Sequence, residues 1–227
     1  MLQELLQNWK NQFQILKKQT RICKVCFDPI DDKSLYNIFH KNSCLCSKCR
    51  KRFKPKFIKF DIDGYEALSI YDYDETIKAL LYQFKGCFDY ELADVFLQPY
   101  YFGLKQMFSG YVLVPIPSFE EDDKIRGFNH VETIFSKLKL PIINALVKTD
   151  HFKQAENTSK ERKNIGNYLT IKQVQGITNK KVLLVDDVYT TGSTMKACTK
   201  LIKNLHPKDI KILVMSKTVF DSSISPI

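Results

Sequence analysis

A short apolar run, two acids and a hydroxyl-rich turn, in that order, constrain this 227-residue chain more than any other feature. The run from Val182 to Val185 is typical of a buried parallel strand. Asp186 and Asp187 follow it directly, and beyond Thr194 apolar residues recur at the spacing of a helix. The segment therefore predicts a strand, an acidic pair, a turn and the start of a helix.

The turn has the chemistry of a phosphate site. A helix N-terminus presents unpaired backbone N–H groups and a partial positive charge, and both attract a phosphate dianion. Gly192 would let the backbone approach closely. The remaining residues of the turn, most of them hydroxyl donors, are Val188, Tyr189, Thr190, Thr191, Ser193 and Thr194. Since carboxylates do not bind phosphate, Asp186 and Asp187 are expected to hold sugar hydroxyls. The alternative is an ordinary strand–helix turn that is acidic by chance.

This signature resembles that of the type I phosphoribosyltransferases, which bind phosphoribosyl pyrophosphate (PRPP). The resemblance implies that the acidic pair contacts the ribose 2′- and 3′-hydroxyls and that the turn holds the 5′-phosphate. A leaving pyrophosphate would need cations and Mg²⁺, and Lys124 and Arg126 offer cations in a preceding loop. The acidic residues of that loop, 120–123, could bridge through Mg²⁺, although a solvated surface loop is the favoured interpretation.

Length and composition favour one main domain with a small appendage. No apolar run is long enough to span a bilayer, and the first residues lack the features of a signal peptide, so we expect a cytoplasmic protein. Seven cysteines in that compartment favour metal binding or burial over disulfides.

The cysteine spacing predicts one structural zinc ion. Two C-x-x-C pairs with 19 residues between them supply four thiolates, which close a tetrahedral coordination sphere and leave no position for catalysis. The expected ligands are Cys23, Cys26, Cys46 and Cys49. Cys44 is expected to pack near the site as a spare thiol, and the isolated Cys87 and Cys198 are expected to be buried.

The net charge of +10 is concentrated near the N-terminus. Residues 1–60 hold 14 Lys and Arg against 4 Asp and Glu, whereas residues 61–227 hold 21 of each. Such a patch suits a polyanion, most often nucleic acid, or is a basic surface without a partner. The candidate nucleic-acid contacts are Lys48, Arg50, Lys51, Arg52, Lys54 and Lys56. The interleaved phenylalanines, Phe39, Phe53, Phe57 and Phe60, would either stack on bases or face the core.

Strands that alternate with helices predict a parallel α/β layer structure. The expected strands cover residues 67–73 at the sheet edge, 111–117, 142–147, 182–185 and 210–215. The expected helices cover residues 2–20, 76–85, 90–97, 130–139 and the segment after 194. Residues 53–64 are expected to form a linker, and residues 148–164 a loop. The predicted divisions are an amphipathic helix (1–20), a basic four-cysteine zinc finger (21–60) and a phosphoribosyltransferase-like domain (61–227).

A second set of motifs resembles the ComF proteins of bacterial competence. It comprises the VPIP run at 114–117, the RGFNHVE run at 126–132, Gln154, and the ERKN run at 161–164. The resemblance implies single-stranded DNA handling during natural transformation and a helicase-like, ATP-driven translocase as partner. His130 stands where the family prefers Gln, and residues 53–64 lack the second cysteine knuckles of many relatives.

Three functions remain open at this level. The favoured one is a DNA-handling adaptor whose PRPP-type pocket binds a phosphoribosyl ligand or a DNA end. The others are an active transferase of nucleotide salvage and a PRPP-sensing regulator that binds nucleic acid. The sequence leaves open whether the protein catalyses a transfer and to which acceptor. A homo-oligomer is possible, but the sequence does not predict the oligomeric state.

Overall fold

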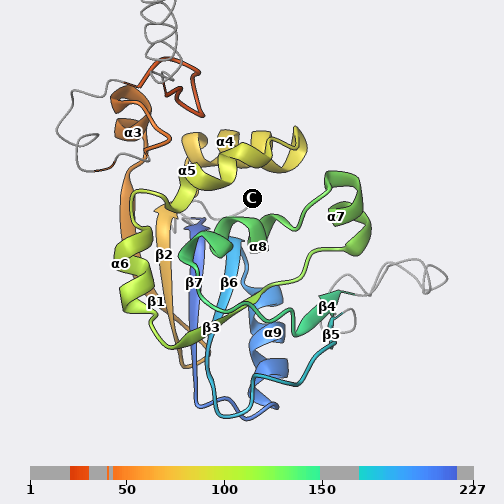
Figure 1. Ribbon diagram of the computed structural model, residues 1–227. Helices are drawn as coiled ribbons and strands as arrows, with labels where there is room; N and C mark the ends of the chain where they lie inside the picture. Colours follow the sequence, from red (N-terminus) through yellow and green to blue (C-terminus); the bar gives the residue numbers. More distant parts are fainter. Residues whose placement is uncertain (1–20, 31–39, 41–42, 149–168, 219–227) are drawn as a thin grey trace, which may run out of the picture. The chain divides into compact units, whose positions relative to one another are not determined.

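The protein is described by a computed structural model that covers residues 21–30, 40, 43–148 and 169–218 (Figure 1). The chain divides into two compact units, residues 1–51 and 52–227. The sequence placed the start of the main domain at residue 61. The expected helix over residues 2–20 and nearly all of the expected loop over residues 148–164 lie outside the described residues.

The smaller unit is built around two short loops that each carry a cysteine pair. In the first loop, the Cys23 N–H donates to the carbonyl of Asp28 and the Phe27 N–H donates to the carbonyl of Cys23, both at 2.9 Å. The second pair leads into helix α3 (Ser47–Arg52). These bonds satisfy the backbone of a segment too short to form a core of its own.

The larger unit is a five-stranded sheet in the order β1-β2-β7-β6-β3. Its strands are β1 (Pro55–Ile62), β2 (Tyr65–Asp72), β3 (Tyr111–Pro115), β6 (Lys181–Tyr189) and β7 (Asp209–Lys217). The β1 strand pairs antiparallel with β2, and all other pairs are parallel. A separate antiparallel pair joins β4 (Leu146–Lys148) to β5 (Leu169–Ile171). The expected α/β class is confirmed.

Helices cover both faces of this sheet (Figure 1). Those that follow the β1–β2 hairpin are α4 (Glu75–Gly86), η1 (Tyr90–Leu92), α5 (Ala93–Leu97) and α6 (Tyr101–Met107). The later ones are α7 (Glu120–Arg126), α8 (His130–Phe135), η2 (Ser136–Leu138) and α9 (Ser193–Lys203). The predicted helices over 76–85, 90–97, 130–139 and after 194 therefore form, with one-turn 3₁₀ segments at two of them.

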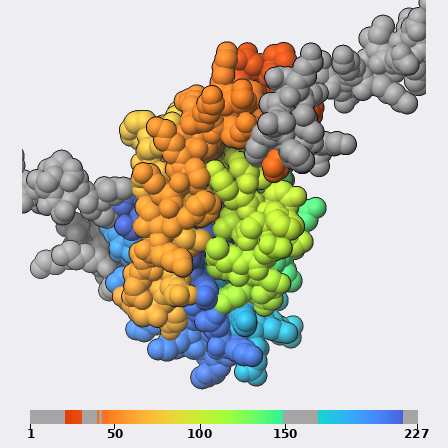
Figure 2. Space-filling view, turned by 90° about the vertical axis from the view of Figure 1, so that its left-hand side faces the viewer, coloured from red at the N-terminus to blue at the C-terminus, as the bar shows by residue number. Residues whose placement is uncertain are grey.

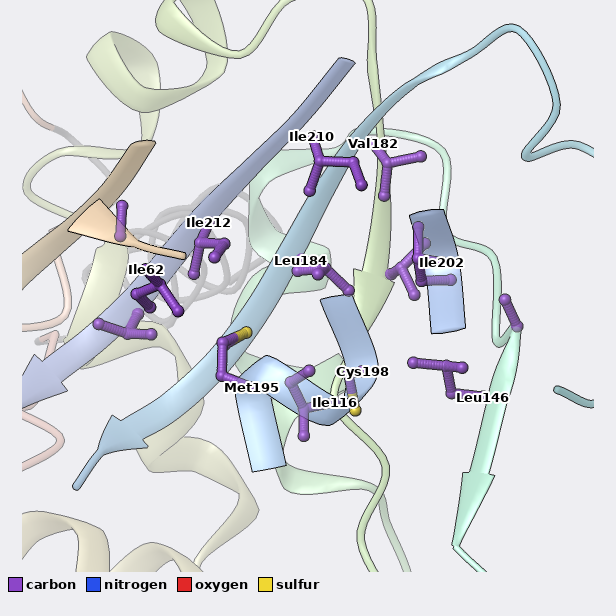
Figure 3. Close-up of a cluster of buried hydrophobic side chains, with 14 of the residues drawn as sticks. Ile62, Ile116, Leu146, Val182, Leu184, Met195, Cys198, Ile202, Ile210 and Ile212 are labelled. Atoms are coloured by element: carbon purple, nitrogen blue, oxygen red, sulfur yellow. The ribbon is translucent and has the colours of Figure 1, made fainter. Parts of the chain in front are cut away.

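The hydrophobic core beneath α9 fixes the position of β6 (Figure 3). Val182 and Leu184 point to this side, where they meet Met195 and Ile202 of α9. The alternate residues of β6, 183 and 185, point to the opposite face and are also fully buried. A strand buried on both faces reads as a continuous apolar run, which is why the sequence identified it.

Four expectations about the chain were wrong. Residues 53–64 are not a linker but contain the edge strand β1 and its hairpin turn, so the strand expected at 67–73 is second in the sheet. Pro55 is tolerated because it opens an edge strand, and Gly64, at φ +88°, takes the left-handed position of the turn. Most of the strand expected at 142–147 is irregular. Cys87 is exposed because it ends α4 instead of lying within it.

Candidate functional site

Asp187 lies near the carboxyl end of β6 and is almost fully buried, with 4% of its surface exposed. Its Oδ2 forms an ion pair with Nζ of Lys85, which comes from the last turn of α4. Its Oδ1 lies 3.7 Å from Nε2 of His130, the first residue of α8. Burial alone would raise the pKa of Asp187, but His130 and Lys85 outweigh it and lower the pKa. Two helices thus hold this carboxylate ionised.

Asp186 experiences the opposite environment. Successive side chains of a strand point to opposite faces, so Asp186 faces α9, where burial and then the Asp186 charge raise the pKa of Cys198. Desolvation raises the pKa of Asp186, and the neighbouring charge of Asp187 raises it further. The acidic pair is therefore adjacent in sequence, but its two side chains point to opposite faces of the sheet and their pKa values shift in opposite directions.

The RGFN run contributes Arg126 and Asn129 to a polar frame next to His130, which also includes Ser118 and Asp123. The Arg126 Nη1 donates to Oδ1 of Asp123 at 2.9 Å and to Nδ1 of His130 at 3.1 Å. Asn129 Nδ2 donates to the other carboxylate oxygen of Asp123 at 2.8 Å, and Ser118 Oγ donates to Oδ1 at 2.6 Å. Because arginine has only donors, the Nδ1 of His130 must accept, and its ring proton sits on Nε2, facing Asp187.

The two cations expected to meet pyrophosphate are placed differently. Arg126 is mostly enclosed by the frame, whereas Lys124 is exposed and pairs with Glu120 at 3.8 Å. The acidic residues 120–123 are not a loop but the first turn of α7. Negative charge there is stabilised by the helix dipole, and Asp123 has a structural partner in Arg126.

The hydroxyl turn leads into the start of α9 with no side-chain cap on the helix. Gly192 adopts φ +76°, and a Cβ on it would lie 2.3 Å from the Tyr189 hydroxyl. The Tyr189 ring packs edge-on against Phe60 of β1 at 5.0 Å. Thr190, Thr191 and Ser193 are exposed, and Thr194 is half-buried. The turn therefore combines exposed donors, an uncapped helix start and a backbone position that requires glycine.

The larger unit also brings in residues that sequence reasoning missed. Lys85 carries no motif, and the only hint was a basic residue at the end of an amphipathic helix. His130 was noted only as a departure from the Gln that the family prefers, yet it faces Asp187. Phe60 was treated as part of the basic segment, but it packs on Tyr189. Each contact joins elements that are distant in the chain, so no local pattern indicates it.

In the smaller unit, the sulfur atoms of the four predicted zinc ligands, Cys23, Cys26, Cys46 and Cys49, all lie within 4.8 Å of one another. The Cys49 N–H donates to Sγ of Cys46 at 3.4 Å. Burial would raise the pKa of Cys23, but backbone N–H groups that include those of Cys46 and Cys26 lower it to about 7. Four converging thiols with a stabilised thiolate could hold a metal ion. Cys44 is buried and is not one of this group.

The expected nucleic-acid contacts are mostly exposed. Lys48 and Lys51 on α3, and Arg52, Lys54 and Lys56 after them, are exposed, whereas Arg50 is half-buried. Of the phenylalanines, Phe53 packs into the core against Tyr71, with ring centroids 5.9 Å apart, and Phe57 is exposed. Phe39 lies outside the described residues.

Comparison with known proteins places this geometry in context. The model of the phosphoribosyl transferase domain matches residues 126–218, which include Arg126 and Asn129 of the polar frame, β6, the hydroxyl turn and α9. Competence protein ComFC of Streptococcus pneumoniae is 28% identical over 200 residues, covering 78% of this chain and 90% of that protein. Competence protein ComFC of Bacillus subtilis is 28% identical over 183 residues, covering 79% and 71%. The resemblance to the ComF proteins is confirmed.

The chain also matches solved structures of phosphoribosyltransferases. A hypoxanthine-guanine phosphoribosyltransferase of Bacillus anthracis matches with 15% identity and a TM-score of 0.37, covering 61% of this chain and 76% of that one. A shared domain type does not by itself establish catalysis. Within the described residues, no helix is long and apolar enough to cross a membrane.

Proposed function

We propose that the protein handles single-stranded DNA during uptake in natural transformation and that its β6–α9 turn binds PRPP or a related ribose 5-phosphate compound. The observation that carries the ligand site is the start of α9, which has no side-chain cap and follows the exposed hydroxyls at the carboxyl end of β6, the strand that carries the buried Asp187. An anion is the natural partner of such a helix start, since its first N–H groups have no intrahelical acceptor.

The ribose would lie against Asp187. The Oδ1 of this residue is 3.7 Å from His130, longer than a hydrogen bond, so it retains capacity to accept from a sugar hydroxyl. Lys85 keeps the carboxylate ionised, and an ionised carboxylate accepts the stronger hydrogen bonds. Asp186 would contribute the second contact after a shift in the end of β6. Mg²⁺ would accompany a pyrophosphate group at this site.

The exposed basic residues support the DNA part of the proposal. Five of the six expected contacts, Lys48, Lys51, Arg52, Lys54 and Lys56, are available to phosphates. Binding through such contacts releases counterions, so affinity should fall steeply with salt. A helicase-like translocase is the expected partner, as the resemblance implies.

One structural zinc ion completes the proposal. Four cysteine thiolates within 4.8 Å of one another suit tetrahedral zinc, and residues 21–51 would depend on it for folding. The metal would hold the two loops together and would take no part in chemistry at the β6–α9 turn.

The test is calorimetric titration of the full chain with PRPP and Mg²⁺, alone and in the presence of single-stranded DNA. Asp187→Ala should abolish PRPP binding, while Asp63→Ala, an exposed acid in the β1–β2 turn, should not. If the Asp187 variant retains wild-type affinity, the ligand site is wrong. Incorporation of label from PRPP into a nucleotide would instead favour an active transferase.

A further inference from the structure

We propose that a groove between β1 and α6 binds the unpaired bases of single-stranded DNA. Figure 2 shows β1 in orange beside α6 in yellow-green, with the surface hollowed between them. This inference rests on the proposed handling of single-stranded DNA and assigns a base-binding surface that is separate from the lysines and arginines of α3. All residues of the groove belong to the larger unit.

The groove has a volume of about 240 Å³. Its walls are Lys59 and Phe60 from β1 and Met107 and Phe108 from the end of α6. Glu66 of β2 and Lys211 of β7 contribute to its floor. Met107 is 59% exposed, so the end of α6 presents a large apolar side chain to the groove.

Met107 lines the groove, and Gly103 lies one turn earlier on the same side of α6. Tyr100, Gly103 and Met107 are spaced three and four residues apart, which places them on one face of the helix. Tyr100 meets Phe57 of β1 edge-to-face with ring centroids 5.3 Å apart. A Cβ on Gly103 would meet no atom within 4 Å, although glycine is a poor helix former. Glycine therefore leaves space above the groove.

The charge around the groove identifies its occupant. Lys54, Lys56 and Lys59 are exposed along β1, and the single acid of the floor, Glu66, is neutralised by Lys211 at 2.5 Å. Lysines beside the exposed ring of Phe57 suit a strand whose phosphates meet the cations while a base stacks on that ring. Lysines on an edge strand also discourage pairing with another peptide strand, which favours nucleic acid over a protein segment.

The test uses two substitutions at one position. Gly103→Leu would place a bulky side chain one turn from Met107 on the side of α6 that borders the groove, whereas Gly103→Ala adds only a methyl group that meets nothing. Both residues are better helix formers than glycine, so neither variant should unfold the protein, and thermal melting checks this. Fluorescence anisotropy compares binding to an oligothymidylate of about 20 nucleotides and to an abasic strand of the same length.

We expect the wild-type chain and Gly103→Ala to prefer oligothymidylate over the abasic strand. Gly103→Leu should bind oligothymidylate about tenfold more weakly, about 1.4 kcal/mol, with its abasic binding unchanged. If Gly103→Leu binds oligothymidylate with wild-type affinity, or loses equal affinity for both strands, the groove proposal is wrong and the proposed function still stands. A wild-type chain that binds no single-stranded DNA would overturn the proposed function and the groove with it.

Discussion

Lys85 and Asp187 form an ion pair between the last turn of α4 and the carboxyl end of β6. The lysine is partly exposed, with 31% of its side chain accessible, whereas the aspartate side chain is 6% accessible. Removing the cation would leave a buried carboxylate with only His130 nearby, which is a costly arrangement. The helix α4 contributes nothing to the signature motif. Through Lys85 it nevertheless stabilises the charge of Asp187, the residue expected to bind the ribose hydroxyls.

Lys85→Met should destabilise the protein by about 2 kcal/mol near neutral pH. The folded-state pKa of Asp187 lies below its ordinary value, so its contribution is present above the unfolded pKa and is lost as pH falls through the folded pKa. Without Lys85 the folded pKa rises, and the loss begins at higher pH. Urea unfolding at several pH values measures this, with Lys78→Met on the same helix as the control. An equal effect from both variants would contradict it.

Asp186→Asn and Asp187→Asn should change stability in opposite directions. The raised pKa of Asp186 means that the folded state holds the proton more tightly, so its ionised form destabilises the fold at pH values above that pKa. Asp186→Asn should therefore stabilise by about 1 kcal/mol while it weakens PRPP binding. Asp187→Asn should destabilise, because Lys85 loses its counter-charge. Thermal melting at neutral pH, paired with PRPP titration, gives both signs, and shifts in the same direction would refute the assignment.

The parts of the site that the sequence predicted are those in which neighbours in the chain are also neighbours in space. The apolar run, the acids and the turn from 182 to 194 are one continuous strand–turn–helix, so their pattern is local. The cysteine pairs are similar, since each C-x-x-C forms a local loop and the two loops meet. A glycine required at positive φ and a pair of metal-binding thiols can each be recognised in a sequence, because few other residues meet these requirements.

The missed parts depend on packing between distant elements. Nothing near Lys85 indicates that α4 ends beside β6, because that follows from how helices cover the sheet. The linker expected at 53–64 shows the same limit: proline, glycine and lysine suggested a break, but they are also the residues of a protected edge strand. Whether such a segment pairs is decided by its partner, here β2.

Gly192→Ala should cost more stability than Gly64→Ala, although both glycines have positive φ. At Gly64 a Cβ meets no atom within 4 Å, so only backbone strain of about 1 kcal/mol is expected. At Gly192 the Cβ would also displace Tyr189 and intrude on the turn. PRPP affinity should fall for Gly192→Ala and stay unchanged for Gly64→Ala. Chemical denaturation and titration of both variants, with Tyr189→Ala added to Gly192→Ala to relieve the clash, separate the two effects.

Zinc removal should loosen residues 21–51 and leave the sheet intact. The two units are compact in themselves, and the described residues of the smaller one are held together chiefly where four sulfur atoms converge, as is typical of a small metal-dependent segment. After chelation, amide hydrogen exchange should accelerate in the described residues of this unit and stay slow in β6 and β7. Cys46→Ser should release the metal, while Cys44→Ser, outside the sulfur cluster, should retain one zinc per chain. A single cooperative collapse of both units on chelation would show that the sheet depends on the metal as well.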